Sequence, residues 1–157
     1  MQAGRFVTDR SLAWFARRLR ALGHDVRVMD GVTLPVLCAV GRAEARVVLT
    51  SSRRVPPPCG AVARVVVPHG DVTTAVREIA AAYTPPSAPF ERCLECNAEL
   101  ERTDAPPPEH ASAPPLPRRV RHCPGCGRWY WRGSHVDRLR EWLEAALGRP
   151  VALDDDR

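Results

Sequence analysis

The sequence predicts an α/β fold with a mostly parallel sheet, followed by a C-terminal zinc ribbon and a terminal helix. Over residues 1–86, short apolar runs alternate with segments of helical periodicity, an order typical of a parallel sheet with helices on both faces. Residues 90–150 hold two Cys-x-x-Cys pairs and a last amphipathic segment. We expect an α/β domain over 1–86 and a zinc-dependent module over 90–150, which is too short to bury a core without its metal.

The first strand and helix are expected close to the N-terminus. Phe6 and Val7 form a short apolar run that ends at Asp9, and apolar side chains then recur at helical spacing until Gly23 ends the helix. The opposite face of this helix carries Arg10, Arg17, Arg18 and Arg20. Such a face can contact phosphates or lie in solvent.

A second strand, a second helix and a third strand follow. Val26 and Val28 fall on one side of the strand predicted at Asp25–Met29. Pro35 suits the first position of a helix that continues through residues 36–45. The continuous apolar run Arg46–Thr50 is typical of a strand buried on both faces.

A fourth strand of the same buried type is expected at Ala63–Val67, after a loop enforced by the prolines at 56–58. Asp71 then opens a third helix, whose apolar stripe ends at Tyr83. The run Pro85–Pro89 predicts a linker into the zinc module.

The chain closes with a strand and a helix after the second cysteine pair. The aromatic run Arg128–Arg132 predicts the strand. Ser134 and Asp137 have the spacing of a capping box at the start of the helix. We expect the apolar face of this helix to pack back on one of the modules; it consists of Val136, Leu139, Leu143 and Leu147.

The two cysteine pairs predict a structural zinc site. Two residues between cysteines let one tight turn aim both thiolates at an ion, and two such turns complete a tetrahedral shell with no position open for catalysis. Asn97 and Gly127 follow the pairs, and both residue types take the left-handed conformation that such a turn needs. The predicted ligands are Cys93, Cys96, Cys123 and Cys126.

Two other interpretations of these cysteines stay open. A pair of disulfides would need an oxidising compartment, whereas a redox Cys-x-x-Cys needs no matching second pair. The spacer between the pairs exceeds the usual ~15–20 residues. Its proline-rich part, residues 105–117, is expected to form an extruded loop that leaves the ribbon unchanged.

Composition describes a basic globular protein. The formal net charge is +5, so polyanions are the natural class of partner. No apolar run approaches 18 residues, and Met1–Asp9 lacks the layout of a secretory signal, so we expect a cytoplasmic protein without membrane association. In that compartment Cys38 and Cys59 would be reduced thiols. The sequence is silent on oligomeric state and on protein partners.

Three aspartates are expected at one edge of the predicted sheet. Asp9, Asp30 and Asp71 each follow a predicted strand, and the carboxyl ends of parallel strands share one edge. Clustered carboxylates bind Mg²⁺ or Mn²⁺, and such an ion can activate water for attack on a phosphodiester. Each aspartate also suits a purely structural role, as a helix cap or a turn residue.

Motifs near both ends of the chain carry a family resemblance. Residues 6–10 read Phe-Val-Thr-Asp-Arg, residues 19–25 read Leu-Arg-Ala-Leu-Gly-His-Asp, and Tyr-Trp-Arg-Gly-Ser-His stands at 130–135 after the second cysteine pair. From Phe6 to Leu147 the chain resembles the Mut-7 C-terminal RNase domain family. The resemblance implies a PIN-like three-layer fold and a metal-dependent endoribonuclease, a hydrolase that cleaves RNA with Mg²⁺ or Mn²⁺ in an acidic cluster.

Two positions depart from the family pattern. Asp9 matches the first acidic position and Asp71 lies near a later one, but Ser52 stands where the family motif Leu-Thr-Arg-Asp ends, and the segment starting at Leu34 lacks an acid that the family carries. A hydroxyl holds a divalent ion far more weakly than a carboxylate does. Two functions stay open: a ribonuclease weakened by lost acids, and a degenerate module that binds RNA or a protein without cleavage.

The basic and aromatic run after the second cysteine pair is the predicted RNA contact. Guanidinium groups can meet phosphates and rings can stack on bases, although aromatic residues beside a small ribbon also serve as its packing. The run consists of Arg128, Trp129, Tyr130, Trp131 and Arg132.

Overall fold

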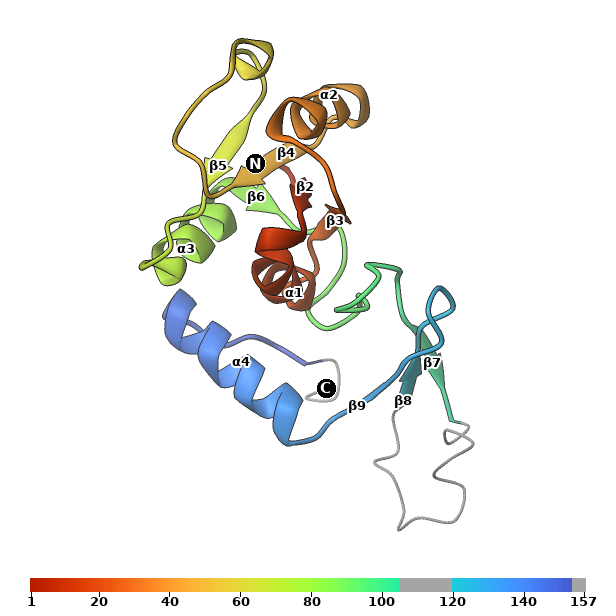
Figure 1. Cartoon of the computed structure of the whole chain (residues 1–157). Helices are drawn as coiled ribbons and strands as arrows, with labels where there is room; N and C mark the ends of the chain where they lie inside the picture. The colour runs from red at the N-terminus through yellow and green to blue at the C-terminus, as the bar shows by residue number, and fades with distance from the viewer. Residues whose placement is uncertain (105–119, 154–157) are drawn as a thin grey trace.

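A four-stranded parallel sheet forms the centre of the α/β domain (Figure 1). The computed structural model describes residues 1–104 and 120–153, so the predicted loop at 105–117 lies outside the described residues. The strand order is β3-β2-β4-β5, which makes β3 and β5 the edges. The strands are β2 (Arg5–Asp9), β3 (Asp25–Met29), β4 (Val47–Thr50) and β5 (Arg64–Val66).

Helices cover both faces of this sheet, as the alternating pattern predicts. Side chains of a strand point to opposite faces in turn, and β2 places Phe6 and Val7 in two different apolar clusters. The Phe6 cluster packs under α1 (Ala13–Ala21) and α3 (Val72–Ala82), whereas the Val7 cluster packs under α2 (Leu34–Glu44). The result is three layers, with α1 and α3 on one face of the sheet and α2 on the other (Figure 1).

One strand prediction and one helix prediction need correction. The fourth strand was expected to be buried on both faces, but β5 is an edge strand in which Val66 is 36% exposed. The third helix ends at Ala82 rather than at Tyr83, because β6 (Tyr83–Thr84) is extended and pairs in parallel with β1 (Gln2–Ala3). The Tyr83 ring packs edge-on against Phe6, with 5.2 Å between the ring centroids.

The ribbon is a small antiparallel sheet, and the last helix returns from it to the α/β domain. β8 (Val120–His122) lies between β7 (Glu101–Thr103) and β9 (Trp129–Trp131). Helix α4 (Ser134–Leu147) runs back to lie beside α3 (Figure 1). Its Leu143 is fully buried in the same cluster as Phe6, so the terminal helix completes the core of the α/β domain.

The predicted capping box of α4 is wrong. The N-cap is Gly133, which makes no side-chain cap, and its carbonyl accepts the first helical hydrogen bond from the Asp137 N–H at 3.0 Å. Ser134 is therefore already inside the helix. The Asp137 carboxylate instead pairs with Arg132 at 3.5 Å.

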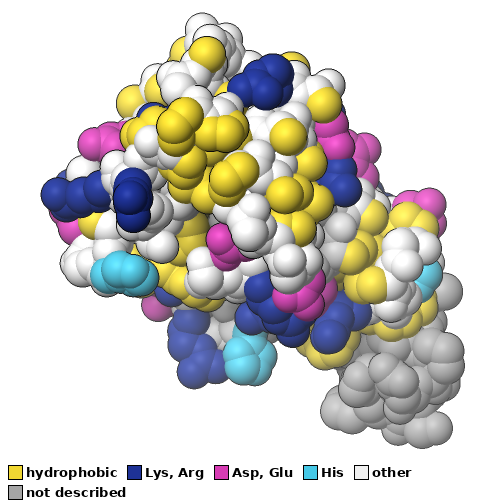
Figure 2. Space-filling model, turned by 45° about the horizontal axis from the view of Figure 1, so that its top comes forward, with side chains coloured by type: hydrophobic (Ala, Val, Ile, Leu, Met, Phe, Trp, Pro, Cys, Tyr) yellow, Lys and Arg dark blue, Asp and Glu magenta, His cyan; other side chains and the backbone are white. Residues whose placement is uncertain are grey.

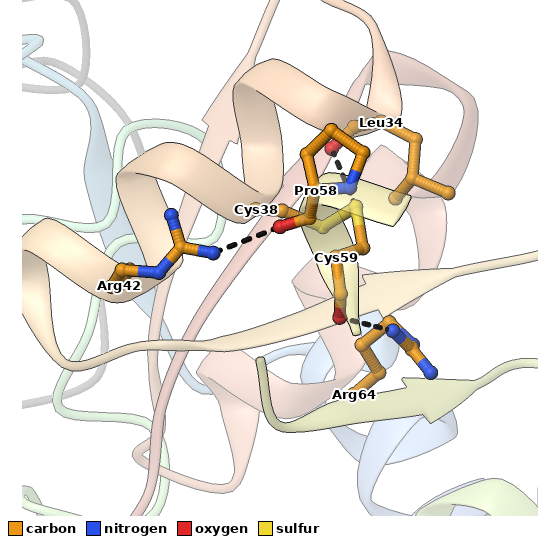
Figure 3. Close-up of a disulfide and its surroundings, with 6 residues drawn as sticks. All are labelled: Leu34, Cys38, Arg42, Pro58, Cys59 and Arg64. Atoms are coloured by element: carbon orange, nitrogen blue, oxygen red, sulfur yellow. Dashed lines mark hydrogen bonds between the residues drawn. A yellow bond between two sulfur atoms is a disulfide. The ribbon is translucent and has the colours of Figure 1, made fainter. Parts of the chain in front are cut away.

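Cys38 and Cys59 form a disulfide, which corrects the expectation of two reduced thiols. Cys38 lies on the inner face of α2, and Cys59 ends the short 3-10 helix η2 (Pro57–Cys59) that folds back onto α2 (Figure 3). Their Cα atoms are 5.4 Å apart, within the span that a disulfide bridges. Arg42 holds this turn by donating to the Pro58 carbonyl at 2.8 Å, and Arg64 donates to the Cys59 carbonyl at 2.6 Å.

None of the helices within residues 1–104 and 120–153 has the length and apolar character that crossing a membrane requires.

Candidate metal centre and acidic edge

The four cysteines of the two pairs meet at one point. Their sulfur atoms all lie within 4.8 Å of one another, with Cys93 Sγ 3.6 Å from Cys126 Sγ and Cys96 Sγ 3.3 Å from Cys123 Sγ. Sulfur atoms around a tetrahedral zinc, each about 2.3 Å from the metal, stand roughly 3.8 Å apart. The spacing therefore fits four zinc ligands, and all four are free of disulfides.

The backbone of each cysteine pair forms the same kind of turn, and we call each of the two turns a knuckle. The Cys96 N–H donates to Cys93 Sγ at 3.5 Å, and the Cys126 N–H donates to Cys123 Sγ at 3.4 Å. Asn97 and Gly127 close the two turns, each with φ of 74°. The left-handed conformation predicted at both positions is thus confirmed.

The thiols of the cluster differ in how readily they ionise. Burial opposes ionisation of Cys93, but hydrogen bonds from the Tyr130 hydroxyl, 3.1 Å away, and from backbone N–H groups lower its pKa to about 6. Burial and the neighbouring sulfurs raise the pKa of Cys96 to about 12. Four thiolates cannot share this space without a cation, and a divalent metal removes that penalty.

The first knuckle is attached to the α/β domain through the Asn97 side chain. Its Oδ1 accepts from the Val26 N–H at 2.9 Å, and its Nδ2 donates to Asp25 at 2.7 Å. Asp25 also pairs with Arg46 at 2.9 Å, and burial, which would raise its pKa, is outweighed by these partners, so the pKa falls to about 2. Sequence reasoning treated Asn97 as a turn residue and missed this role, for which the sequence has no local signal.

Asp9 ends β2, Asp30 directly follows β3, and Asp71 caps α3 five residues after the end of β5. We call these three aspartates the acidic edge, and each of them is engaged locally. Asp9 ends β2 and accepts from the Ser11 N–H at 2.7 Å. Asp30 follows β3 and pairs with Arg10 at 3.4 Å. Asp71 caps α3 by accepting from the Thr74 N–H at 3.0 Å and the Thr74 hydroxyl at 2.6 Å.

These carboxylates do not gather as the cysteines do. Within the described parts of the chain, the four cysteines are the one group of three or more Cys, His, Asp or Glu side chains whose ligand atoms come together to hold an ion. Hydrogen bonds from the Thr74 side chain and backbone lower the pKa of Asp71. The Ser52 Oγ, near the end of β4, accepts from the Arg54 N–H at 3.2 Å. The residues of the acidic edge therefore share a position in the sheet without forming a cage.

The predicted RNA contact residues lie on and beside β9. Tyr130 is engaged with the cysteine cluster through Cys93, and Trp129 packs on His122 with ring centroids 4.6 Å apart. Arg128 and the aromatic residues line a groove of about 410 Å³ that also borders Cys126. On the face drawn in Figure 2, basic side chains stand in several separate groups with acidic ones beside them.

The family model described as the Mut7-C RNAse domain matches residues 4–143, a span that includes both the parallel sheet and the four cysteines. Neither the curated proteins nor the solved structures contain a match to the chain.

Proposed function

Because this chain belongs to the Mut7-C RNAse domain family, we propose that it is a metal-dependent endoribonuclease with a PIN-like fold and a structural zinc ribbon. The family match over residues 4–143 carries this proposal. The three-layer order, with an aspartate at the carboxyl end of β2, supports it, since open α/β sheets bind their ligands at that edge.

The acidic edge supplies only part of a Mg²⁺ or Mn²⁺ site. The Asp9 Oδ1 atom accepts from the Ser11 N–H, so the second carboxylate oxygen remains for a cation. Asp30 and Asp71 follow other strands of the same sheet and would supply further oxygens. A divalent ion there would activate water toward the phosphodiester. Because the carboxylates are not gathered and Ser52 replaces an expected acid, we propose that the ion is held weakly.

RNA would be recognised mainly through the ribbon. Arg128 is exposed and borders the groove of about 410 Å³ beside the knuckle, where a phosphate and a base could be held together. The alternative function, a catalytically degenerate module that binds RNA or a protein, uses the same groove. It is favoured by the absence of carboxylates at Ser52 and Leu34.

Cleavage of single-stranded RNA across a Mn²⁺ titration tests the proposal. We expect weak cleavage that rises with Mn²⁺ concentration, an increase with Ser52→Asp, and none with Asp9→Asn. Glu141→Gln, an exposed change on α4 away from the edge, is the matched control and should behave as wild type. If neither wild type nor Ser52→Asp cleaves at high Mn²⁺, the binding alternative is preferred.

A cytoplasmic location belongs to the same proposal. It is supported by the four unpaired thiols that a zinc centre requires, because such thiols persist in reducing compartments. The Cys38–Cys59 disulfide is the feature that argues against it.

A further inference from the structure

Arg20 reaches from α1 to the first knuckle through a buried guanidinium group. The residue is 4% exposed, and its Nη1 donates to the carbonyls of Leu94 at 2.7 Å and Glu95 at 2.8 Å. Those two residues lie between the predicted zinc ligands Cys93 and Cys96. Its Nε and Nη2 donate to the Val26 carbonyl at 3.1 and 2.7 Å. One side chain therefore joins helix α1, strand β3 and the knuckle.

The charge of Arg20 has no carboxylate partner among the described residues. All its hydrogen bonds go to backbone carbonyls, and the nearby Glu95 carboxylate pairs with Arg17 at 2.9 Å. A buried cation without a compensating charge is strongly destabilising. Burial lowers the pKa of Arg20, and negative charge on Cys93, on Cys96 and on the nearby Glu95 carboxylate opposes that shift.

A zinc ion with four thiolates carries a net charge of about −2, from four single negative charges and one double positive charge. The carbonyls that Arg20 holds belong to the two residues that link Cys93 to Cys96 in the first knuckle. Cys93 and Cys123 are buried while Cys96 and Cys126 are exposed, so the dianion is partly shielded from water and attracts the buried Arg20 cation more strongly than a fully solvated charge would. A zinc-bound cysteine cluster would therefore supply the negative charge that compensates the buried Arg20 cation.

The knuckle also covers an edge of the parallel sheet. β3 is an edge strand, so its outward N–H and carbonyl groups need other partners. The Val26 N–H donates to Asn97 Oδ1, and the Val26 carbonyl accepts from Arg20. Both backbone groups of this strand residue therefore depend on the knuckle or on the side chain that holds it.

We propose that Arg20 is the charge partner of the zinc centre, and that zinc occupancy thereby controls the stability of the β3 edge of the α/β domain. The ribbon is then part of one folding unit with the parallel sheet, rather than an appended module. The inference rests on the zinc site and not on ribonuclease activity, so failure of the nuclease proposal leaves it standing.

The first test compares zinc retention in Arg20→Met, which removes the charge, with Arg17→Met. Arg17 lies on the same helix and touches the same knuckle, but through an exposed pair with the Glu95 side chain. Zinc is titrated out with a coloured chelator. We expect Arg20→Met to lose zinc about 10–100-fold more readily than wild type, the usual effect of losing a residue around a metal site, and Arg17→Met to remain within about twofold of wild type. Equal retention in the two variants would overturn the proposal.

The second test uses the wild-type protein, so it stands even if Arg20→Met fails to fold. Amide hydrogen exchange is measured before and after chelation. We expect Val26 and Arg27 in β3 to lose protection when zinc is removed, while Val48 in β4, inside the sheet, changes least. Unchanged protection of β3 in zinc-free protein would refute the coupling, and purified protein with far less than one zinc per chain would remove the metal assignment itself.

Discussion

The cysteine cluster and the acidic edge both contain side chains of types that bind metals, but the protein holds the two sets in different ways. In the cysteine cluster, residues from α1, β3 and β9 contact the knuckles or their cysteines, and the four sulfur atoms lie within 4.8 Å of one another. At the acidic edge, each aspartate is bound within its own cap or surface pair. The cysteine cluster is assembled by tertiary contacts of the protein, whereas the three carboxylates would have to be brought together by the cation itself.

The largest expected effect is loss of a knuckle cysteine. Cys123→Ser removes a buried predicted zinc ligand, and structural zinc sites in small modules contribute on the order of 10 kcal/mol to folding. We expect less than one tenth of the wild-type zinc content and a melting temperature lower by at least about 10 °C. Zinc content by atomic emission and thermal unfolding by circular dichroism measure both. A variant that melts with wild type would show that the ribbon folds without its metal.

The next effect concerns the second set of cysteines, on the other side of the sheet. Removing a crosslink between residues 21 positions apart should lower the free energy of unfolding by about 3 kcal/mol, mainly by freeing the unfolded chain. The paired variant Cys38→Ala with Cys59→Ala, compared with wild type in urea without reductant, measures it. Counting thiols in denatured, zinc-free protein is the check: four are expected, and six would show that Cys38 and Cys59 are reduced.

Local features of this fold could be predicted from the sequence. The spacing of the cysteines, the turn preferences of Asn97 and Gly127, and the cap at Asp71 depend on residues only a few positions apart. The alternation of strands and helices likewise predicted the three layers, because the spacing of apolar residues within each segment indicates whether it is a strand or a helix. Family motifs extended this to the identity of the domain.

Long-range features could not be predicted. The bond between Cys38 and Cys59 depends on how the η2 turn folds back on α2, and the clamp from Arg20 to Leu94 joins residues 74 positions apart. At the start of α4, one glycine took the cap position that Ser134 was expected to fill, because both residues suit it. For the acidic edge, the sequence placed the aspartates at strand ends but contained no information on how far apart their side chains lie.

A smaller effect is expected from acid acting on Asp25, which supports the knuckle from the α/β domain. Its pKa of about 2 lies below the ordinary value near 3.9, so its contribution is present above about pH 4 and is lost as the pH falls toward 2. We expect Asp25→Asn to be less stable than wild type at pH 6 by about 1–2 kcal/mol, allowing for solvent screening. The difference between the two proteins in urea unfolding should shrink below pH 4. Acid also releases zinc, but it does so in both proteins, and a difference that stays constant with pH would contradict the assignment.

The smallest effect separates capping from metal binding at Asp71. An asparagine keeps the oxygen that accepts from the Thr74 N–H, so Asp71→Asn should change stability by only a few tenths of a kcal/mol, whereas Asp71→Ala loses the cap and costs about 1 kcal/mol.

Metal binding predicts a different result for the same two variants. Both substitutions remove the negative charge that a divalent ion needs, so both should weaken binding of the ion to the same extent. If Asp71 is a ligand, both variants should weaken the Mn²⁺ dependence of RNA cleavage equally; if it is only a cap, Asp71→Asn should match wild type. For a wild type without cleavage, Mn²⁺-induced relaxation of the Asp71 and Asp9 amides gives the same comparison. A site that responds to Asp9→Asn but not to Asp71→Asn would leave Asp71 as a structural residue and narrow the acidic edge to the ends of β2 and β3.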